Sequence, residues 1–288
     1  MSLALPARGR ETVRREISPR RVVAALVLAA ILALALAAPL VAPFDPLDQD
    51  LLALNQPPGP EHWLGTDHMG RDVFSRLAMG ARTTLMVGFG GALVAFVLGA
   101  GCGLIALSLG RWAETALFAL VDLVRAMPDV LLALLLIVAL GAGARPVVIA
   151  LGIAFAPFFA YVARATFHRE MVKDYVAAAR LFGGGRLHVL RLHLAPNLVG
   201  GLVTQAAILL PRCVVTESVL SFLGLGSSPD APTWGRMVAD ASRYIESSPH
   251  AILAPVVAIV LLTLSLSILG EAVRRRLDPL RHAGEAAL

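Results

Sequence analysis

The chain offers few residues that could carry out a chemical reaction. His188 and His193 are five positions apart, which turns them toward different faces of a helix, so they do not predict a pair of metal ligands. The only lysine, Lys173, is not part of a Gly-x-x-x-x-Gly-Lys-Ser/Thr phosphate loop. The patterns Gly-x-Ser-x-Gly and His-Glu-x-x-His are both missing. We therefore expect no catalytic residue, no metal site and no cofactor bound by this chain, and so no enzyme.

Several charged residues stand inside otherwise apolar segments. Asp122, Arg125 and Asp129 are spaced i, i+3 and i+7 near the expected inner end of the third apolar segment, so Arg125 could pair with either acid. A structural ion pair at a helix end is the favoured interpretation, and gating is the alternative. Glu217 is a carboxylate near the outer end of the fifth segment. A functional role and a bond to the backbone of the following SFLGLG segment are equally supported for it.

Composition decides what kind of element carries these residues. The chain has 288 residues, of which 57% are hydrophobic and 16% charged, and its mean hydropathy is +0.75, which excludes an ordinary soluble protein. A helix needs about 20 apolar residues to cross a bilayer core of about 30 Å. Nearly uncharged stretches that suit such helices lie between residues 21–45, 82–111, 129–145, 145–164, 191–212 and 246–271. We expect an all-α, polytopic membrane protein with six transmembrane helices.

The apolar segments also predict the domain boundaries. Residues 22–43 form the first transmembrane helix, because this stretch exceeds the apolar core of about 7 to 15 residues in a secretory signal. An external loop covers 44–82, a transmembrane domain with five further helices covers 83–273, and tails cover 1–21 and 274–288. Most Lys and Arg residues fall on one side of this arrangement, which predicts that both tails are cytoplasmic. The basic charge sets orientation, and we expect no nucleic-acid partner.

One long inner connection, about 166–196, interrupts the apolar pattern. Its first part, 170–182, has helical periodicity, and Gly183 begins a run of three glycines that ends this helix. A second short helix over 186–194 would lead into Pro196 at the start of the next span. A solvated amphipathic connection and a surface that docks a partner fit this pattern equally well.

Four blocks of the sequence resemble a known family. They are HWLGTDHMGRDVFSRLAMGARTTL at 62–85, VDLVRAMPDVLLA at 121–133, AAARLFG followed by HLAP between 177 and 196, and TESVLSFLGLGSSPDAPTWGRM at 216–237. These blocks are similar to permease subunits of bacterial ATP-binding-cassette (ABC) importers of the dipeptide, oligopeptide and nickel branch, specifically its C-type permease. The first and last blocks are long and specific, whereas the third alone would be moderate evidence.

The resemblance implies roles for individual residues. The inner connection would be the coupling loop, whose short helix sits in a cleft of an ATPase subunit. Ala177 stands where the family has a glutamate, so Arg180 could carry more of that contact. The coupling-loop residues are Tyr175, Ala177, Ala178, Ala179, Arg180, Gly183 and Pro196. The external motif comprises Gly65, Thr66, Asp67, Gly70, Arg71, Asp72, Trp234 and Gly235, and ordering of the first loop by Asp67, Arg71 and Asp72 is favoured over contact with a binding protein.

The resemblance also implies an assembly in the bacterial inner membrane. The chain would pair with a second homologous permease, two ATPases that bind ATP and Mg²⁺, and an extracytoplasmic binding protein that delivers a small peptide or similar solute. An ion-coupled secondary transporter is one alternative, but the central parts of spans one, two, four and six lack the ionisable groups it needs. A structural membrane scaffold is the other, and it leaves the Gly- and Pro-rich outer block without a purpose.

Overall fold

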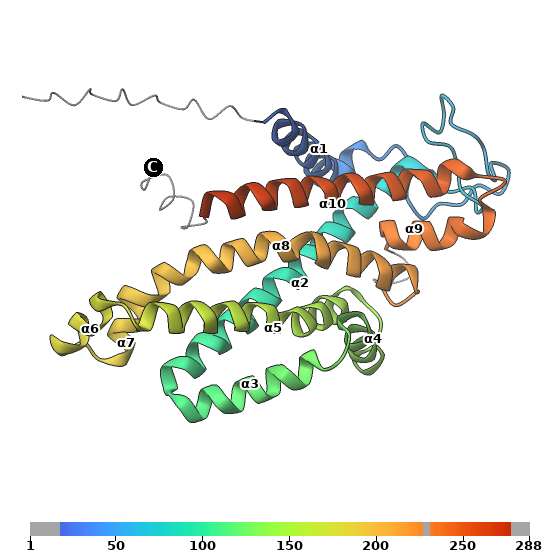
Figure 1. The fold of residues 1–288 in the computed structure, drawn as a ribbon. Helices are drawn as coiled ribbons and strands as arrows, with labels where there is room; N and C mark the ends of the chain where they lie inside the picture. The colour runs from blue at the N-terminus through green and yellow to red at the C-terminus, as the bar shows by residue number, and fades with distance from the viewer. Residues whose placement is uncertain (1–17, 227–230, 278–288) are drawn as a thin grey trace, which may run out of the picture.

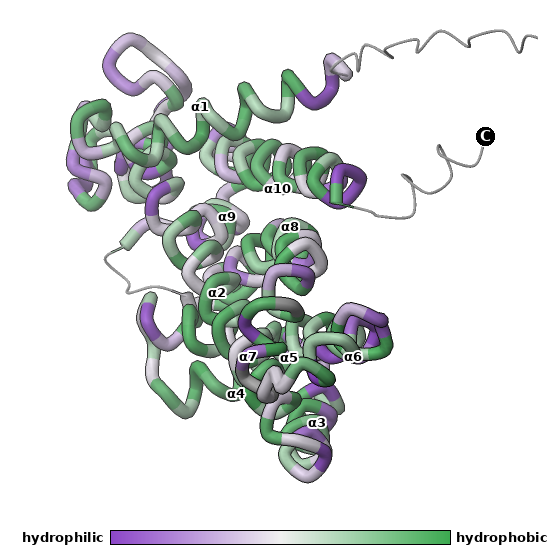
Figure 2. Tube along the Cα trace, turned by 90° about the vertical axis from the view of Figure 1, so that its left-hand side faces the viewer, coloured by the Kyte–Doolittle hydropathy of each residue, from purple (hydrophilic) through white to green (hydrophobic). Residues whose placement is uncertain are grey.

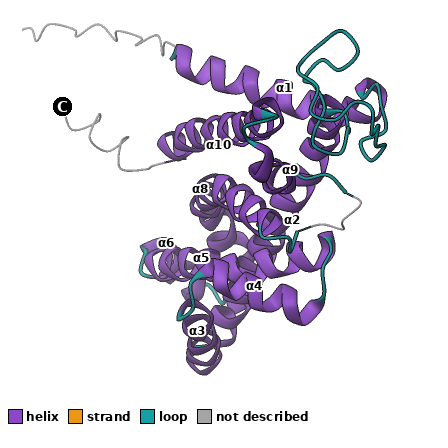
Figure 3. Ribbon diagram, turned by 90° about the vertical axis from the view of Figure 1, so that its right-hand side faces the viewer, coloured by secondary structure: helices purple, strands orange, loops and turns teal. Residues whose placement is uncertain are grey.

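The computed structural model describes residues 18–226 and 231–277, and this part of the chain is built of helices and loops (Figure 3). Thr66 and Asp72 form an isolated bridge, and no described residue belongs to a strand. The helices are α1 (Pro19–Val41), α2 (Val73–Leu109), α3 (Arg111–Arg125), α4 (Asp129–Leu140), α5 (Ala144–Met171), α6 (Asp174–Leu181), α7 (Arg186–Val189), α8 (Ala195–Phe222), α9 (Trp234–Ala241) and α10 (Pro249–Leu277). A π turn (Leu190–Leu194) precedes α8, and a 3-10 turn (Ser242–Tyr244) follows α9.

The all-α, polytopic prediction is confirmed. Five helices, α1, α2, α5, α8 and α10, are long and apolar enough to cross a membrane, and a sixth crossing results if α3 and α4 together form one span. Those two helices meet at an angle of 94°. Pro128 causes the break, because proline has no N–H to continue α3 and disfavours helical backbone in the residue before it. The third span, if α3 and α4 form it together, is therefore broken at residues 126–128.

The helix that follows the first loop begins earlier in the chain than hydropathy predicts. Helix α2 begins at Val73, so the last part of the expected 44–82 loop is helical. Asp72 caps this helix by accepting a hydrogen bond from the Ser75 backbone N–H at 2.7 Å. Arg76 and Arg82 hide the first turns from a hydropathy scan, since charged residues lower the average although they do not stop a helix.

The centre of the molecule is the contact between α2 and α5. A Cβ on Gly99 of α2 would lie 2.1 Å from the Ala156 carbonyl oxygen of α5, so only glycine permits this approach. One apolar core lies around α2, α4, α5 and α8, and it includes Phe155, Phe159 and Ile137. A second core lies between α1, α2, α9 and α10. In Figure 1, α2 crosses α5 and α8 obliquely. Helix α10 packs on α8 on the side away from α5, and α1 packs against α10 and α2.

The polar segments gather at the two ends of the bundle. Helices α6 and α7 lie at one end, called the α6 end, and α9 lies with residues 44–72 at the opposite end, called the α9 end (Figure 1). The long helices are mainly hydrophobic along their length, while α3, α6 and the first loop carry hydrophilic stretches (Figure 2). Residues 1–17, 227–230 and 278–288 are outside the described part of the chain. These residues include most of both predicted tails and part of the 216–237 block.

Candidate functional site

A buried carboxylate fixes the corner between α5 and α6. Glu170, only 3% exposed, accepts a hydrogen bond from the Tyr175 hydroxyl at 2.7 Å and an ion pair from Lys173 Nζ at 2.7 Å. Asn197 of α8 donates to the Tyr175 hydroxyl at 3.3 Å, so three helices meet here. The expected single helix over 170–182 is therefore two helices, because α5 ends at Met171 and the chain turns at this carboxylate.

Helix α6 ends in a glycine turn with a defined hydrogen-bond pattern. The Gly184 N–H donates to the Ala179 carbonyl and the Gly183 N–H donates to the Arg180 carbonyl, which is the Schellman arrangement. Gly183 has φ of +84°, and a Cβ on Gly184 would lie 2.6 Å from the Ala179 carbonyl oxygen. A Cβ on Gly185 would meet nothing within 4 Å. Two of the three glycines are thus required by the turn.

The segment after the turn is not a separate second helix. Helix α7, the π turn and α8 follow one another without a break from Arg186 to Phe222. Pro196 lies in the first turn of α8 and has no N–H to donate. The π turn over 190–194 accommodates this missing bond, since a π turn shifts the hydrogen-bond register by one residue. The side chain of His193 is outside the described part of the chain.

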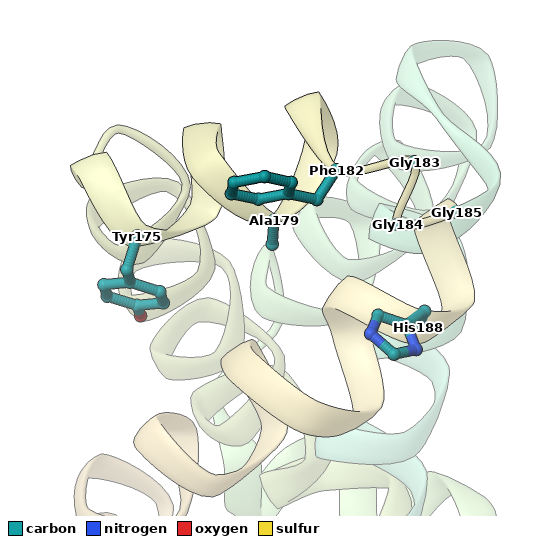
Figure 4. Close-up of a pocket in the computed structure, with 7 residues that line it drawn as sticks. All are labelled: Tyr175, Ala179, Phe182, Gly183, Gly184, Gly185 and His188. Atoms are coloured by element: carbon teal, nitrogen blue, oxygen red, sulfur yellow. The ribbon is translucent and has the colours of Figure 1, made fainter.

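The α6 end presents an open hollow and exposed apolar side chains. The hollow has a volume of about 530 Å³ and is lined by Tyr175, Ala179, Phe182, Gly183, Gly184, Gly185 and His188 (Figure 4). Val176 is fully buried beneath α6 and anchors it to the core. Phe182 is 90% exposed, and its neighbour Leu181 and the corner residue Val172 are exposed to a similar degree. Exposed apolar side chains at a polar end of the bundle indicate a surface that a partner covers.

The remaining predicted coupling residues differ in how exposed their side chains are. Ala177 is exposed, whereas Ala178 and Ala179 are half-buried. Arg180 is exposed and its Nη2 lies 3.5 Å from Met171 Sδ, so its side chain folds back toward α5. Sequence reasoning missed Glu170, although a lone acid beside the end of an apolar segment was a signal that could have found it.

The α9 end is held by a network of buried ion pairs. Asp67 accepts hydrogen bonds from Arg71 Nε at 2.8 Å and from Arg76 Nη1. Asp240, from α9, receives Nη2 of both arginines at 3.1 Å. Burial raises the pKa of the Asp67 carboxyl, but Arg76, Arg71 and two backbone N–H groups outweigh this effect and hold the pKa below its ordinary value. Arg76 and Asp240, which sequence reasoning missed, join the loop to two helices.

Hydrogen bonds and close packing complete this end. Thr66 Oγ1 donates to the Ala53 carbonyl at 2.5 Å, and Asp72 Oδ1 pairs with His62 Nδ1 at 2.9 Å. The Trp234 side chain is 1% exposed and donates to the Leu77 carbonyl at 2.9 Å. Three glycines of the motif allow backbone contacts that a Cβ would block: Gly65 against the Gln56 carbonyl, Gly70 against Asp50 and Gly235 against the Ser218 carbonyl. Ordering of the first loop is what these contacts do.

The intramembrane charged residues pair differently from the expectation. Arg125 makes no ion pair with Asp122 or Asp129, and no described acid lies within ion-pair distance of it. Its guanidinium instead lies over the rings of Tyr161 and Phe158, at 5.0 and 5.3 Å from their centroids. Asp129 pairs with Arg212 of α8 at 2.5 Å, and Asp122 accepts the Tyr161 hydroxyl. The 94° bend between α3 and α4 separates Arg125 from Asp129, which periodicity along one straight helix could not foresee.

Glu217 is fully buried within α8. It accepts hydrogen bonds from the hydroxyls of Ser221 at 2.7 Å and Ser218 at 3.4 Å. Its partners are side chains of its own helix and Thr84 of α2, and the bond to the following backbone that the sequence left open is not among them. This carboxylate does not reach the charged residues of α3, α4 and α5.

Two family models cover most of the chain. Residues 91–282 match the binding-protein-dependent transport system inner membrane component, and residues 18–58 match the N-terminal transmembrane domain of oligopeptide transport permease C. The chain belongs to the binding-protein-dependent transport permeases. This permease is 34% identical to the dipeptide transport system permease protein DppC of Alkalihalophilus pseudofirmus, over 78% of this chain and 74% of that one.

Other relatives are named for different solutes. The permease is 35% identical to the glutathione transport system permease protein GsiD of Pectobacterium atrosepticum, over 78% of this chain and 75% of that protein. It is 30% identical to the probable D,D-dipeptide transport system permease protein DdpC of Escherichia coli, over 91% and 88%. Inward-facing structures of the MetNI methionine ABC transporter share the fold, with a TM-score of 0.58, 22% identity, and coverage of 70% of this chain and 96% of that chain.

The family fixes the general function of the permease. It is a transmembrane subunit of an ABC importer in the inner membrane, it is not itself an enzyme, and it works with ATPase and binding-protein partners. The family and its relatives support this function over an ion-coupled secondary transporter or a structural scaffold. The two ends of the bundle are then candidate contact surfaces for those two kinds of partner.

Proposed function

We propose that the permease pairs with a second, homologous permease to import short peptides or similar solutes, and that the α6 end receives the ATPase. Relatives named for dipeptides, glutathione and D,D-dipeptides support the solute class. The α6 end would be cytoplasmic, together with both chain termini, and the α9 end would face the binding protein. ATP and Mg²⁺ would bind to the two ATPase subunits, so this chain itself needs no cofactor.

The exposed apolar tip of α6 is the observation that carries the coupling proposal. Phe182 lies against the outer side of the hollow, above Ala179, in a turn that Gly183 and Gly184 hold in one shape (Figure 4). Beneath the tip, Glu170 and Val176 fix α6 to α5 and to the core. A push on the tip would therefore pass directly into a membrane helix instead of being absorbed by a flexible loop.

Ala177 replaces the family's glutamate, so the contact with the ATPase must depend on other residues of the α6 end. Because Ala177 is exposed, the family's acid at this position would point toward the partner rather than into the bundle. The α6 end has two other carboxylates: Glu170 is buried and stabilises the corner from the inside, and Asp174 is exposed in the first turn of α6, at the end of the helix away from Phe182. The contact with the ATPase would accordingly rest on the apolar tip, with Arg180 at its side.

Purification of the tagged permease from its native host tests this proposal. Proteins that carry a Gly-x-x-x-x-Gly-Lys-Ser/Thr loop, identified by mass spectrometry, should be recovered with the wild-type chain together with a second permease. Phe182→Asp should lower ATPase recovery by about tenfold or more, because it puts a charge in the centre of an apolar contact. Leu52→Asp is the matched control, since Leu52 is 95% exposed at the opposite end. Equal recovery from both variants would remove the coupling assignment.

A further inference from the structure

The bend between α3 and α4 gathers charged and aromatic side chains on an exposed face of the bundle, between its two ends. Asp122 and Arg125 come from the end of α3, Asp129 from the start of α4, Tyr161 from α5 and Arg212 from α8. These five residues are called the crease. In Figures 1 and 3, α3 lies beside α5, consistent with the contacts of Tyr161 to Asp122 and Arg125.

The crease lies at the depth of the hydrocarbon core. Tyr161 is ten residues from the end of α5 at Met171, and Arg212 is ten residues from the end of α8 at Phe222, at the opposite end of the bundle. Each separation corresponds to about 15 Å along the helix axis. That distance is about half the thickness of a bilayer core. Nevertheless the Arg212 side chain is 54% exposed, and Asp122 and Arg125 are exposed as well. Charged groups at this depth face a water-filled cavity or another protein surface, since lipid would not solvate them.

The pairing within the crease leaves one charge of each sign available. Asp129 and Arg212 neutralise each other at 2.5 Å. Asp122 is oriented by the Tyr161 hydroxyl, which does not remove its charge. The Arg125 guanidinium lies over aromatic rings, with its N–H groups not used by any described acid, and Arg212 lies over the same Phe158 ring at 5.2 Å. The exposed carboxylate and the exposed guanidinium are one helical turn apart.

We infer that the crease lines the translocation pathway and contacts a zwitterionic solute, with Asp122 facing its ammonium group and Arg125 its carboxylate. This inference rests on the proposed function, and it names the solute chemistry: a short peptide carries both charges at its ends at neutral pH. The guanidinium offers paired donors to a carboxylate, and aromatic rings at its back keep it from folding away. The contact is transient, because the opposite charge one turn away limits how strongly either ion is held.

Cysteine labelling tests the crease without knowledge of the solute. The chain has two cysteines, of which Cys213 is buried and Cys102 exposed. Cys102→Ser is therefore the parent protein for the cysteine variants, and its own labelling gives the background rate. Ala126→Cys introduces a thiol beside Arg125, at the exposed residue that caps the C-terminus of α3. Leu120→Cys is the matched control, because Leu120 is exposed on the same helix but borders an apolar groove against α2. The probes are anionic sulfonatoethyl and cationic trimethylammonioethyl methanethiosulfonate.

The expected result is rapid labelling at position 126 and slow labelling at position 120. Arg125→Gln should lower the ratio of anionic to cationic labelling rates at position 126 by about three- to tenfold, and Asp122→Asn should raise it by a similar factor. Absence of labelling at position 126 would overturn the inference, since it means that lipid or the second permease covers the crease. Labelling with a ratio that neither substitution changes would overturn the zwitterion contact.

The measurement separates this inference from the proposed function. Labelling is carried out on tagged permease in lipid nanodiscs, and the ATPase content of each sample is scored separately. Missing ATPases in the parent would contradict the proposed assembly. A complex that retains its ATPases but fails in the labelling pattern would contradict the crease alone.

Discussion

The two ends of the bundle differ in how their side chains are paired and covered. At the α9 end, Asp67, Arg71, Arg76 and Asp240 pair with one another in a largely buried network, and Trp234 is enclosed between helices. At the α6 end, a single buried carboxylate and a glycine turn fix the backbone, while Phe182 and its apolar neighbours remain exposed. The charged side chains of the α9 end are paired with one another, whereas the α6 end leaves apolar side chains exposed. Substitutions at the α9 end should therefore affect stability first, and those at the α6 end should affect assembly first.

The largest expected effect comes from opening the α9 network. Asp67→Asn removes the charge shared by two buried arginines and leaves them with Asp240 alone, and removing one partner of a buried ion pair costs about 3–5 kcal/mol. The midpoint of thermal unfolding in detergent should fall strongly, and it can be followed by dye labelling of the buried Cys213 in the Cys102→Ser background. Leu52→Asp, at an exposed position of the same end, should leave the midpoint nearly unchanged. Equal midpoints for both variants would contradict the comparison.

The next effect distinguishes two adjacent glycines at the α6 end. Gly184→Ala places a Cβ against the Ala179 carbonyl, so the turn must open at a cost of about 1–3 kcal/mol. Gly185→Ala meets no neighbour and is the matched control. Recovery of ATPase subunits with the tagged permease should drop for the first variant and stay at the wild-type level for the second. A similar loss from both would show that the shape of the turn is not what the partner reads.

A smaller effect is expected at the α5–α6 corner. Tyr175→Phe removes one hydrogen bond to the buried Glu170, which is worth about 1 kcal/mol. Lys173→Met removes an ion pair whose lysine is half exposed, so its contribution should be smaller still. Thermal midpoints and ATPase recovery should rank wild type, Lys173→Met and Tyr175→Phe in falling order. The reverse order would show that Lys173 stabilises the α5–α6 corner more than Tyr175 does.

The smallest effect is the response of the α9 end to mild acid. Because the folded pKa of Asp67 lies below its ordinary value of 3.8, its contribution to stability is fully present above that value. It is lost only as the pH falls through the lower folded pKa. Thermal midpoints of the wild type should therefore show no loss from Asp67 between pH 7 and 5, and a decrease below about pH 4. In Asp67→Asn this acid-dependent decrease should be reduced.

Several features were predictable because they depend on local chemistry. Hydropathy located the long helices α1, α5, α8 and α10, and the proline and glycine positions marked their breaks. The helix stop at Gly183 follows from the intrinsic preferences of glycine. Hydropathy missed the first turns of α2, because Arg76 is charged in sequence but neutralised in space by acids from the first loop and α9.

The sequence by itself determined the membrane class, the apolar helices and the motif blocks, since these follow from side-chain transfer energies and short-range backbone preferences. The tertiary structure alone decided which charges meet. Arg125 turned to Tyr161 and Phe158, Asp129 turned to Arg212, and Asp240 closed a network begun more than 150 residues earlier at Arg76. Such pairings depend on the 94° bend and on helix packing, which bring together residues whose spacing in the chain carries no information about distance.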